Sequence, residues 1–284
     1  MQHAPPLEPE LMYEDVWANK LTATVLSAVL GPKPVCNFTD GNTALGDGYG
    51  GRQGVHADMA YNFPQMPCTI TANYYVEDVS PANGSTELWL GSARDSTFRD
   101  HKACREAGPG DDVLMPKKIS LHIDDNNYAM EVNFGVREDR LQARRQFAPP
   151  VQPSLKTGSV MLRDLRLWHA GIANPSKKTR IMLNFIHTPW WYQVCRASSR
   201  PLYLPCANEG AQCPTKVNLP ENTRHLVEAW ANRENHPIQI QARYFPTIED
   251  CKAQQFGIDF SSRNPGYWKS LDTSLVAGFT FIDA

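Results

Sequence analysis

The sequence predicts a mainly β fold of the α+β class, in which a barrel or sandwich of short strands is braced by helices. The chain of 284 residues contains 22 prolines and 18 glycines, a turn-rich composition that argues against a helical bundle. Short stretches that alternate apolar and polar residues lie between the turn clusters. Hydrophobic residues make up 42 % of the chain, which is enough for a sizeable core.

The first half of the chain begins with helices and continues with strands. Residues 7–31 are predicted to form one or two helices that end at Gly31-Pro32. The glycine-rich residues 41–54 lack the strand-then-helix context of a phosphate-binding loop, so we expect a flexible loop. Strands are expected at 55–63, 69–78 and 85–90, and a helix at 96–106 that ends at Gly108-Pro109.

The second half repeats the pattern of short strands between helices. A hairpin is expected at 117–136, followed by a polar helix at 136–146 whose four arginines are interpreted as a solvated face. Further strands are predicted at 159–163, 167–170 and 180–187, and a helix at 221–233. We expect no linker or internal repeat to divide the chain.

Charge and cysteine content narrow the class of protein. The 28 Lys and Arg residues nearly balance the 30 Asp and Glu residues, which argues against a general nucleic-acid or anionic-membrane binder. The seven cysteines are scattered and contain no Cys-x-x-Cys pair, so a reducing compartment is favoured. The start of the chain has no apolar signal-peptide core, and the longest apolar stretch is too short to span a bilayer, so we expect a cytoplasmic protein.

The histidines point to a metal site. Eight histidines yield roughly one His-x-Asp or His-x-Glu triplet by chance, whereas this chain has two, His56-Ala-Asp58 and His122-Ile-Asp124. On a strand, His56 and Asp58 point to the same face. With His169 from another strand they would form a two-His, one-carboxylate set that leaves coordination positions open on Fe(II).

The second triplet fits less well. His122 lies only 47 positions before His169, which leaves little room for the strands that would close a barrel. Asp124 also falls in a predicted hairpin turn, where Asp commonly occurs. We therefore prefer His56 and Asp58. Arg180 follows His169 by eleven positions and can hold the far carboxylate of a dicarboxylate that chelates the metal.

These residues together resemble the phytanoyl-CoA dioxygenase family, with the closest likeness to its fungal members that act on small molecules. The resemblance spans roughly residues 50–190 and rests on these pieces: Gln53-x-x-His56-x-Asp58, Asn83-Gly-Ser-Thr86, Gly91-Ser92, and Trp168-His169 with Asn174, Ser176 and Arg180. It implies a double-stranded β-helix, or jelly roll, that uses Fe(II), 2-oxoglutarate and O₂. By position, His56, Asp58 and His169 resemble the iron ligands.

The resemblance also implies roles for the remaining positions. Arg180 resembles the residue that binds the distal carboxylate of 2-oxoglutarate, while Gln53 and Thr86 resemble secondary contacts to that co-substrate. Gly171 stands where some members have Ser, which removes one hydrogen bond to the co-substrate. Only 55 residues precede His56, so a helical layer present in many relatives is trimmed, or replaced by the tail after Trp191 or by a partner subunit.

We therefore expect one oxygenase domain over residues 1–284, with a jelly-roll core at about 33–190 and a C-terminal extension at 191–284. The expected reaction oxidises a C–H bond of a small, mainly apolar molecule in secondary metabolism. Two alternatives stay open: a Zn-dependent hydrolase or isomerase on the same ligands, and a non-catalytic partner of a related oxygenase. We expect the protein to bind a small-molecule substrate and no nucleic acid or membrane. A homodimer, or a heterodimer with a related oxygenase, is an alternative to a monomer.

Overall fold

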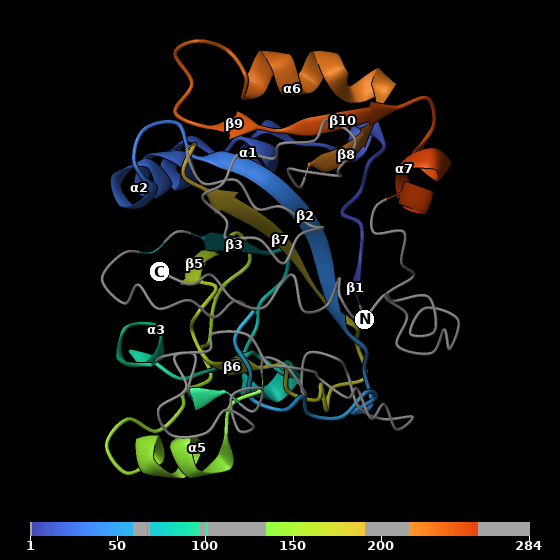
Figure 1. Cartoon of the computed structure of the whole chain (residues 1–284). Helices are drawn as coiled ribbons and strands as arrows, with labels where there is room; N and C mark the ends of the chain where they lie inside the picture. Colours follow the sequence, from blue (N-terminus) through green and yellow to red (C-terminus); the bar gives the residue numbers. More distant parts are fainter. Residues whose placement is uncertain are drawn as a thin grey trace, which may run out of the picture.

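The computed structural model describes residues 2–58, 67, 69–96, 100–101, 135–190 and 216–254. Two helices and the C-terminal elements lie on one side of a central sheet, and a second, smaller set of strands lies on the other side (Figure 1). No helix in these ranges is long and apolar enough to cross a membrane.

The N-terminal segment forms helices where the sequence predicts them. It contains the 3-10 helix η1 (Pro9–Leu11), α1 (Glu14–Trp17) and α2 (Lys20–Leu30). Asn19 caps α2, because its side-chain oxygen accepts a hydrogen bond from the Thr22 N–H at 2.8 Å. The helix ends at Gly31, whose φ of 87° is a conformation that glycine adopts at little cost.

Five strands of the central sheet pair antiparallel in the order β1-β2-β7-β3-β5, and a sixth strand from the C-terminal segment pairs with β2. Its strands are β1 (Gln2–His3), β2 (Val35–Ala44), β3 (Ile70–Tyr75), β5 (Val160–Asp164) and β7 (Arg180–Thr188). The loop predicted at 41–54 was wrong for its first four residues, because Gly41–Ala44 belong to β2. Pairing along the whole length of β7 extends the strand through this glycine.

The two faces of this sheet differ in chemistry. Ile70, Ala72 and Tyr74 point into the main apolar cluster, which also contains Leu183 and Phe185 of β7 and residues of α2. The alternate residues of the same strands, among them Thr71, Asn73 and Arg163, are polar and point the other way. The sheet therefore has one face against a helical layer and one polar, buried face.

Short strands form the second sheet, which faces this polar side. β4 (Glu87–Leu88) pairs with β6 (His169–Ala170), and single bridges add His56 beside His169 and Val151 beside Leu88. Successive segments of the chain alternate between the two sheets. Strands β2, β3, β5 and β7 belong to the central sheet. The segments between them in the sequence, which are His56, then β4 with Val151, then β6, belong to the second sheet. This repeated crossing between two facing sheets is consistent with the jelly-roll arrangement predicted from the sequence.

The outer side of the second sheet is covered by α3 (Ser92–Asp95) and α5 (Glu138–Arg145). Helix α5 confirms the helix predicted at 136–146, but the prediction that its arginines form a purely solvated face was wrong. Arg144 is buried, donates a hydrogen bond to the Leu90 carbonyl at 2.5 Å, and stacks over the Trp168 ring. A helix was expected at 96–106. In the structure α3 ends before it, at Asp95, and most of residues 96–106 lie outside the described residues.

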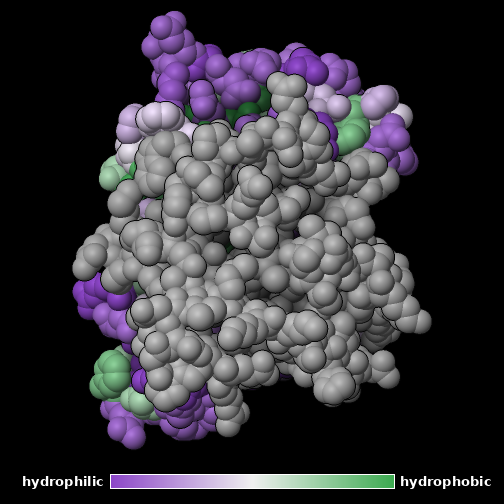
Figure 2. Space-filling model, viewed as in Figure 1, coloured by the Kyte–Doolittle hydropathy of each residue, from purple (hydrophilic) through white to green (hydrophobic). Residues whose placement is uncertain are grey.

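The C-terminal segment closes the helical side of the central sheet. It comprises β8 (Val217–Pro220), η5 (Glu221–Thr223), α6 (Arg224–Trp230), β9 (Gln239–Ile240), β10 (Ala242–Phe245) and α7 (Ile248–Gln254). Strand β9 pairs in parallel with the start of β2, and Leu219, Val227 and Ile238 join the same apolar cluster as Leu7 and Leu26. The outer surface over α6 is hydrophilic (Figures 1 and 2).

Three other elements complete the comparison with the sequence. The 3-10 helix η2 (Pro81–Asn83) precedes β4. In the strand predicted at 55–63, residues 55–58 are described and contribute the bridge at His56. The rest of that strand, and the hairpin predicted at 117–136 up to residue 134, lie outside the described residues.

Candidate metal centre

Two histidines lie side by side in the second sheet. The His56 N–H donates to the His169 carbonyl at 3.0 Å, and the His169 N–H donates to the His56 carbonyl at 2.8 Å. This antiparallel pairing puts both side chains on the same face, with the ring centroids 4.4 Å apart. Both side chains are buried.

Asp58 supplies the carboxylate. It lies two positions after His56 and therefore points to the same side as that histidine. One carboxylate oxygen, Oδ1, lies 3.7 Å from His56 Nε2 and 3.4 Å from His169 Nε2. These three side chains form a group whose ligand atoms all lie within 4.8 Å of one another. The structure thus brings together the three residues that the sequence predicts as metal ligands.

The second ring nitrogen of each histidine lies beside a backbone carbonyl. His56 Nδ1 lies 2.9 Å from the Gly54 carbonyl oxygen, and His169 Nδ1 lies 2.9 Å from the Leu167 carbonyl oxygen. An Nδ1–H of His56 that donates to this carbonyl leaves Nε2 with the lone pair that binds metals. His169 Nδ1 also lies 3.2 Å from Arg163 Nη1, so its role as donor or acceptor depends on the tautomer. Burial lowers the pKa of His56 to about 4, so this imidazole is neutral at physiological pH. This donor set fits a divalent cation such as Fe(II).

Arg163 holds the other side of the carboxylate. Its Nη2 donates to Asp58 Oδ2 at 2.6 Å, and the guanidinium is buried. Burial raises the pKa of the Asp58 carboxyl, but the neighbouring histidines and Arg163 outweigh this effect and hold that pKa well below its ordinary value. The carboxylate is therefore ionised and ready to bind a cation. Arg163 is not among the residues predicted from the sequence, because its partner Asp58 lies 105 positions away in the chain.

Arg180 begins β7 and is almost fully buried, with 3 % of its surface exposed. Among the described residues, Nε and Nη1 of its guanidinium have no hydrogen-bond partner. Burial lowers the pKa of this group, opposed by the nearby Tyr75 and Glu77. Because buried polar groups are nearly always paired, an arginine in this state fits an anionic ligand that binds beside it.

The two predicted secondary contacts lie in different environments. Thr86 is buried just before β4. Gln53 is exposed, and its Oε1 accepts a hydrogen bond from the Gly171 N–H at 2.8 Å, while its own N–H donates to the Gly171 carbonyl at 2.9 Å. A Cβ built on Gly171 would meet Gln53 Oε1 at 2.6 Å, so the Gln53 side chain takes the space that a larger residue at 171 needs.

A row of hydrogen-bonded polar side chains lies on the polar, buried face of the central sheet. Asn184 Oδ1 accepts hydrogen bonds from the Thr71 hydroxyl and, at 3.0 Å, from Asn73 Nδ2. The Asn184 side chain in turn bonds to Asp40, whose Oδ1 has no hydrogen-bond partner in the described part of the chain. Burial raises the pKa of Asp40 to about 7, and the Asp58 charge adds to this effect. The row therefore ends in a carboxyl group with a free acceptor.

Residues of the shared motifs that surround the site have structural roles. The Ser92 hydroxyl accepts a hydrogen bond from the Trp168 N–H at 2.8 Å, directly before His169. Asn174 holds a turn, since its Nδ2 donates to the carbonyls of Ala44 and Lys178. The alternative triplet of His122 and Asp124 lies outside the described residues.

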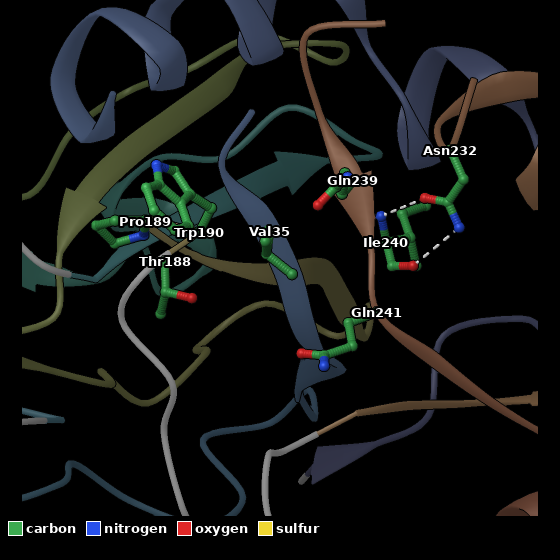
Figure 3. A pocket seen from close by; sticks show the side chains of 8 residues that line it. All are labelled: Val35, Thr188, Pro189, Trp190, Asn232, Gln239, Ile240 and Gln241. Carbon is green, nitrogen blue, oxygen red and sulfur yellow. Dashed lines mark hydrogen bonds between the residues drawn. The ribbon is translucent and has the colours of Figure 1, made fainter. Parts of the chain in front are cut away.

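A separate pocket lies where β2, β7 and β9 meet (Figure 3). Its lining consists of Val35, Thr188, Pro189, Trp190, Asn232, Gln239, Ile240 and Gln241. No titratable side chain is among these residues, and Asn232 already exchanges two hydrogen bonds with the Ile240 backbone. The chemistry of the described residues is therefore concentrated at the histidine pair.

Comparison with known families agrees with this geometry. The profile of the family Phytanoyl-CoA dioxygenase (PhyH) matches residues 6–182, a range that includes both histidines, Asp58 and Arg180. The chain belongs to the phytanoyl-CoA dioxygenase family. The match also ends close after Arg180, before the C-terminal segment that completes the apolar cluster.

Several solved structures are similar to this member of the phytanoyl-CoA dioxygenase family. EctD from S. alaskensis with 2-oxoglutarate and 5-hydroxyectoine is 17 % identical over 81 % of this chain and 62 % of its own, with a TM-score of 0.45. EvdO2 from Micromonospora carbonacea var. aurantiaca with 2-oxoglutarate is 16 % identical over 66 % of each chain, with a TM-score of 0.45. Against three others, EvdMO1, ThoJ and EctD with bound Fe, the match spans 30 %, 65 % and 50 % of the other chain.

Proposed function

We propose that this chain is an Fe(II)/2-oxoglutarate-dependent oxygenase whose iron is held by His56, Asp58 and His169. The observation that carries the proposal is the convergence of the three ligand atoms, which all lie within 4.8 Å of one another. Family membership supports the same reaction class. When bound, the iron and 2-oxoglutarate would activate O₂ for the oxidation of a C–H bond.

The protein's own groups would position the reactants. Arg180 would bind the distal carboxylate of 2-oxoglutarate through its planar fork of donors, which completes the hydrogen bonds that its Nε and Nη1 lack within the described chain. Thr86 and Gln53 would make secondary contacts with the co-substrate. The burial of both histidines and Arg180 would keep water away from the reacting atoms.

The substrate that we propose is a small, mainly apolar molecule of secondary metabolism, converted in the cytoplasm. The reaction outcomes that fit are hydroxylation, desaturation and rearrangement, because each begins with the loss of one C–H hydrogen. We propose a single domain over residues 1–284, with a core at about 33–190 and an extension at 191–284. The apolar cluster that joins residues of the N-terminal helices to residues of α6 and β9 supports this organisation.

Anaerobic titration tests the metal and co-substrate roles. Addition of 2-oxoglutarate to the Fe(II)-loaded protein is expected to produce a weak visible charge-transfer band, as chelation of iron with open positions would require. His169→Ala should abolish iron binding, whereas His122→Ala and the exposed His225→Ala should leave it intact. Absence of the band from the wild-type protein would contradict the proposal, and a band without turnover of any substrate would favour a non-catalytic partner.

A further inference from the structure

Arg163 is a second charged group at the proposed metal site, and neither the family resemblance nor the predicted ligand set includes it. Its side chain extends from β5 of the central sheet to Asp58, which follows the bridged segment of the second sheet. Its Nη1 also lies 3.2 Å from His169 Nδ1. The Asp58 N–H donates to the Leu165 carbonyl at 2.9 Å, which holds the Asp58 backbone beside the end of β5. The ion pair therefore links the two sheets directly at the site.

The two oxygens of Asp58 have separate tasks in this arrangement. Oδ1 faces the Nε2 atoms of His56 and His169 at 3.7 and 3.4 Å. Oδ2 accepts the Arg163 hydrogen bond at 2.6 Å, a short distance that is typical of a charge-assisted pair. A carboxylate held in this way presents one oxygen to a cation and keeps the other away from it.

We propose that Arg163 is a positioning residue that restricts Asp58 to one-oxygen coordination of the metal. Three single-atom protein ligands leave three of six octahedral positions open. Bidentate 2-oxoglutarate would take two of them and O₂ the third. If both oxygens of Asp58 bound the metal, one of these positions would be lost. The inference rests on the proposed function, since it assumes a metal between the three ligands.

Removal of the Arg163 charge has two opposite physical effects on metal binding. Loss of a positive group near the site would, by electrostatics alone, strengthen the binding of a divalent cation. Loss of a partner that orients a ligand typically weakens metal affinity by about 10–100-fold. A freed second oxygen of Asp58 would itself add a bond to the metal, so affinity alone does not report positioning. The visible spectrum of the bound ion and its affinity for 2-oxoglutarate do, because both depend on the open positions.

The chain provides a matched control in Arg166. This arginine is buried to a similar degree and pairs with a carboxylate, since its Nε and Nη2 donate to Asp164 at 3.0 and 2.6 Å. Its pair lies in the turn after β5 and does not involve the three proposed ligands. Substitution of Arg166 reproduces the loss of a buried ion pair without a change in the contacts of Asp58.

The experiment titrates Co(II) as the probe into the full-length, metal-free wild-type protein and into R163M, R163K and R166M, and follows the visible absorption of the bound ion. We expect Co(II) bound to R163M to have an altered visible spectrum, because the second oxygen of Asp58 can then reach the ion. R163K should recover part of the wild-type spectrum, and R166M should match the wild type. Titration of the Co(II)-loaded proteins with 2-oxoglutarate should show weaker binding in R163M alone.

The other possible results would contradict the inference alone or the proposed function as well. A wild-type spectrum with wild-type 2-oxoglutarate affinity in R163M, or equal changes in R166M, would overturn the positioning role while the proposed function stands. If R163M does not fold, R163K decides, because a wild-type spectrum and wild-type 2-oxoglutarate affinity in R163K would show that the guanidinium is not needed and would overturn the positioning role. A wild-type protein that binds neither Co(II) nor Fe(II) would overturn both the inference and the proposed function.

Discussion

His56 and His169 form a hydrogen-bonded antiparallel pair, in which each residue donates its backbone N–H to the carbonyl oxygen of the other. The spacing of their rings is therefore set by backbone pairing and does not depend on loop conformation. This pair also brings together two residues that are 113 positions apart in the sequence. Changes in the strands that hold this bridge should consequently affect the proposed metal centre.

Ser92→Ala tests one such support. The substitution removes the acceptor of the Trp168 N–H, next to His169, and leaves a buried donor unpaired. We expect the free energy of unfolding to fall by about 1–3 kcal/mol, as measured by urea denaturation of the metal-free protein. Ser154→Ala, at an exposed position, is the control and should change it by less than about 0.5 kcal/mol. Equal stability of the two variants would show that the Ser92 hydroxyl does not support this strand.

Arg180→Met tests the proposed anion site. A buried hydrogen bond between charged groups contributes about 1.5–3 kcal/mol, so we expect 2-oxoglutarate to bind about 10–150-fold more weakly. The measurement is anaerobic titration of the Fe(II)-loaded protein with 2-oxoglutarate. Fe(II) affinity itself should stay at the wild-type value, because Arg180 is not among the proposed ligands. Wild-type affinity for 2-oxoglutarate in this variant would place the co-substrate carboxylate elsewhere.

Asp40→Asn should change how stability depends on pH. Because burial raises the pKa of Asp40 in the folded protein to about 7, from about 3.8 when unfolded, the folded state binds more protons between these values. Asp40 therefore makes the wild-type protein less stable as pH rises from 4 towards 7. Asparagine has no such titration, so the stability of Asp40→Asn relative to wild type should increase from pH 5 to pH 8.

Urea denaturation at the two pH values, with the metal removed by chelation, measures this difference. A relative stability that stays constant or decreases between pH 5 and pH 8 would contradict the raised pKa of Asp40. Glu234→Gln, an exposed position outside the sheet, provides the control for general effects of charge removal.

Gly171→Ala tests the contact between Gly171 and Gln53. The added Cβ would meet Gln53 Oε1 at 2.6 Å, so that side chain must move and give up its hydrogen bond to the Gly171 N–H. We expect a loss of about 0.5–1.5 kcal/mol in the free energy of unfolding. In a Gln53→Ala background the same substitution should cost little. Additive effects of the two substitutions in a double-mutant cycle would contradict direct coupling.

The sequence predicted local features well where short-range chemistry determines them. Gly31 ends α2 as predicted, and the alternation of Ile70, Ala72 and Tyr74 identified the apolar face of β3. The spacing of His56, Asp58 and His169 predicted that these side chains meet, and they do. Their role as iron ligands stays a prediction.

The features that the sequence did not reveal depend on contacts between distant segments. Arg163 is separated from Asp58 by 105 positions, and nothing local to β5 shows that the two sheets bring them together. Arg144 belongs to a polar helix by composition, but its position beside Trp168 buries it. The parallel pairing of β9 with β2 involves only two residue pairs, which is too short to produce a recognisable pattern.

The shared cluster of Leu7 and Leu26 with Leu219, Val227 and Ile238 has a consequence for biosynthesis. These residues lie near opposite ends of the chain, so the helical layer cannot complete its packing until residue 240 or so has left the ribosome. The proposed ligands, by contrast, are all synthesised by residue 169. The nascent chain therefore carries every proposed ligand well before its apolar layer is closed, and a chain that stops at Trp190 would lack Leu219, Val227 and Ile238 of this cluster.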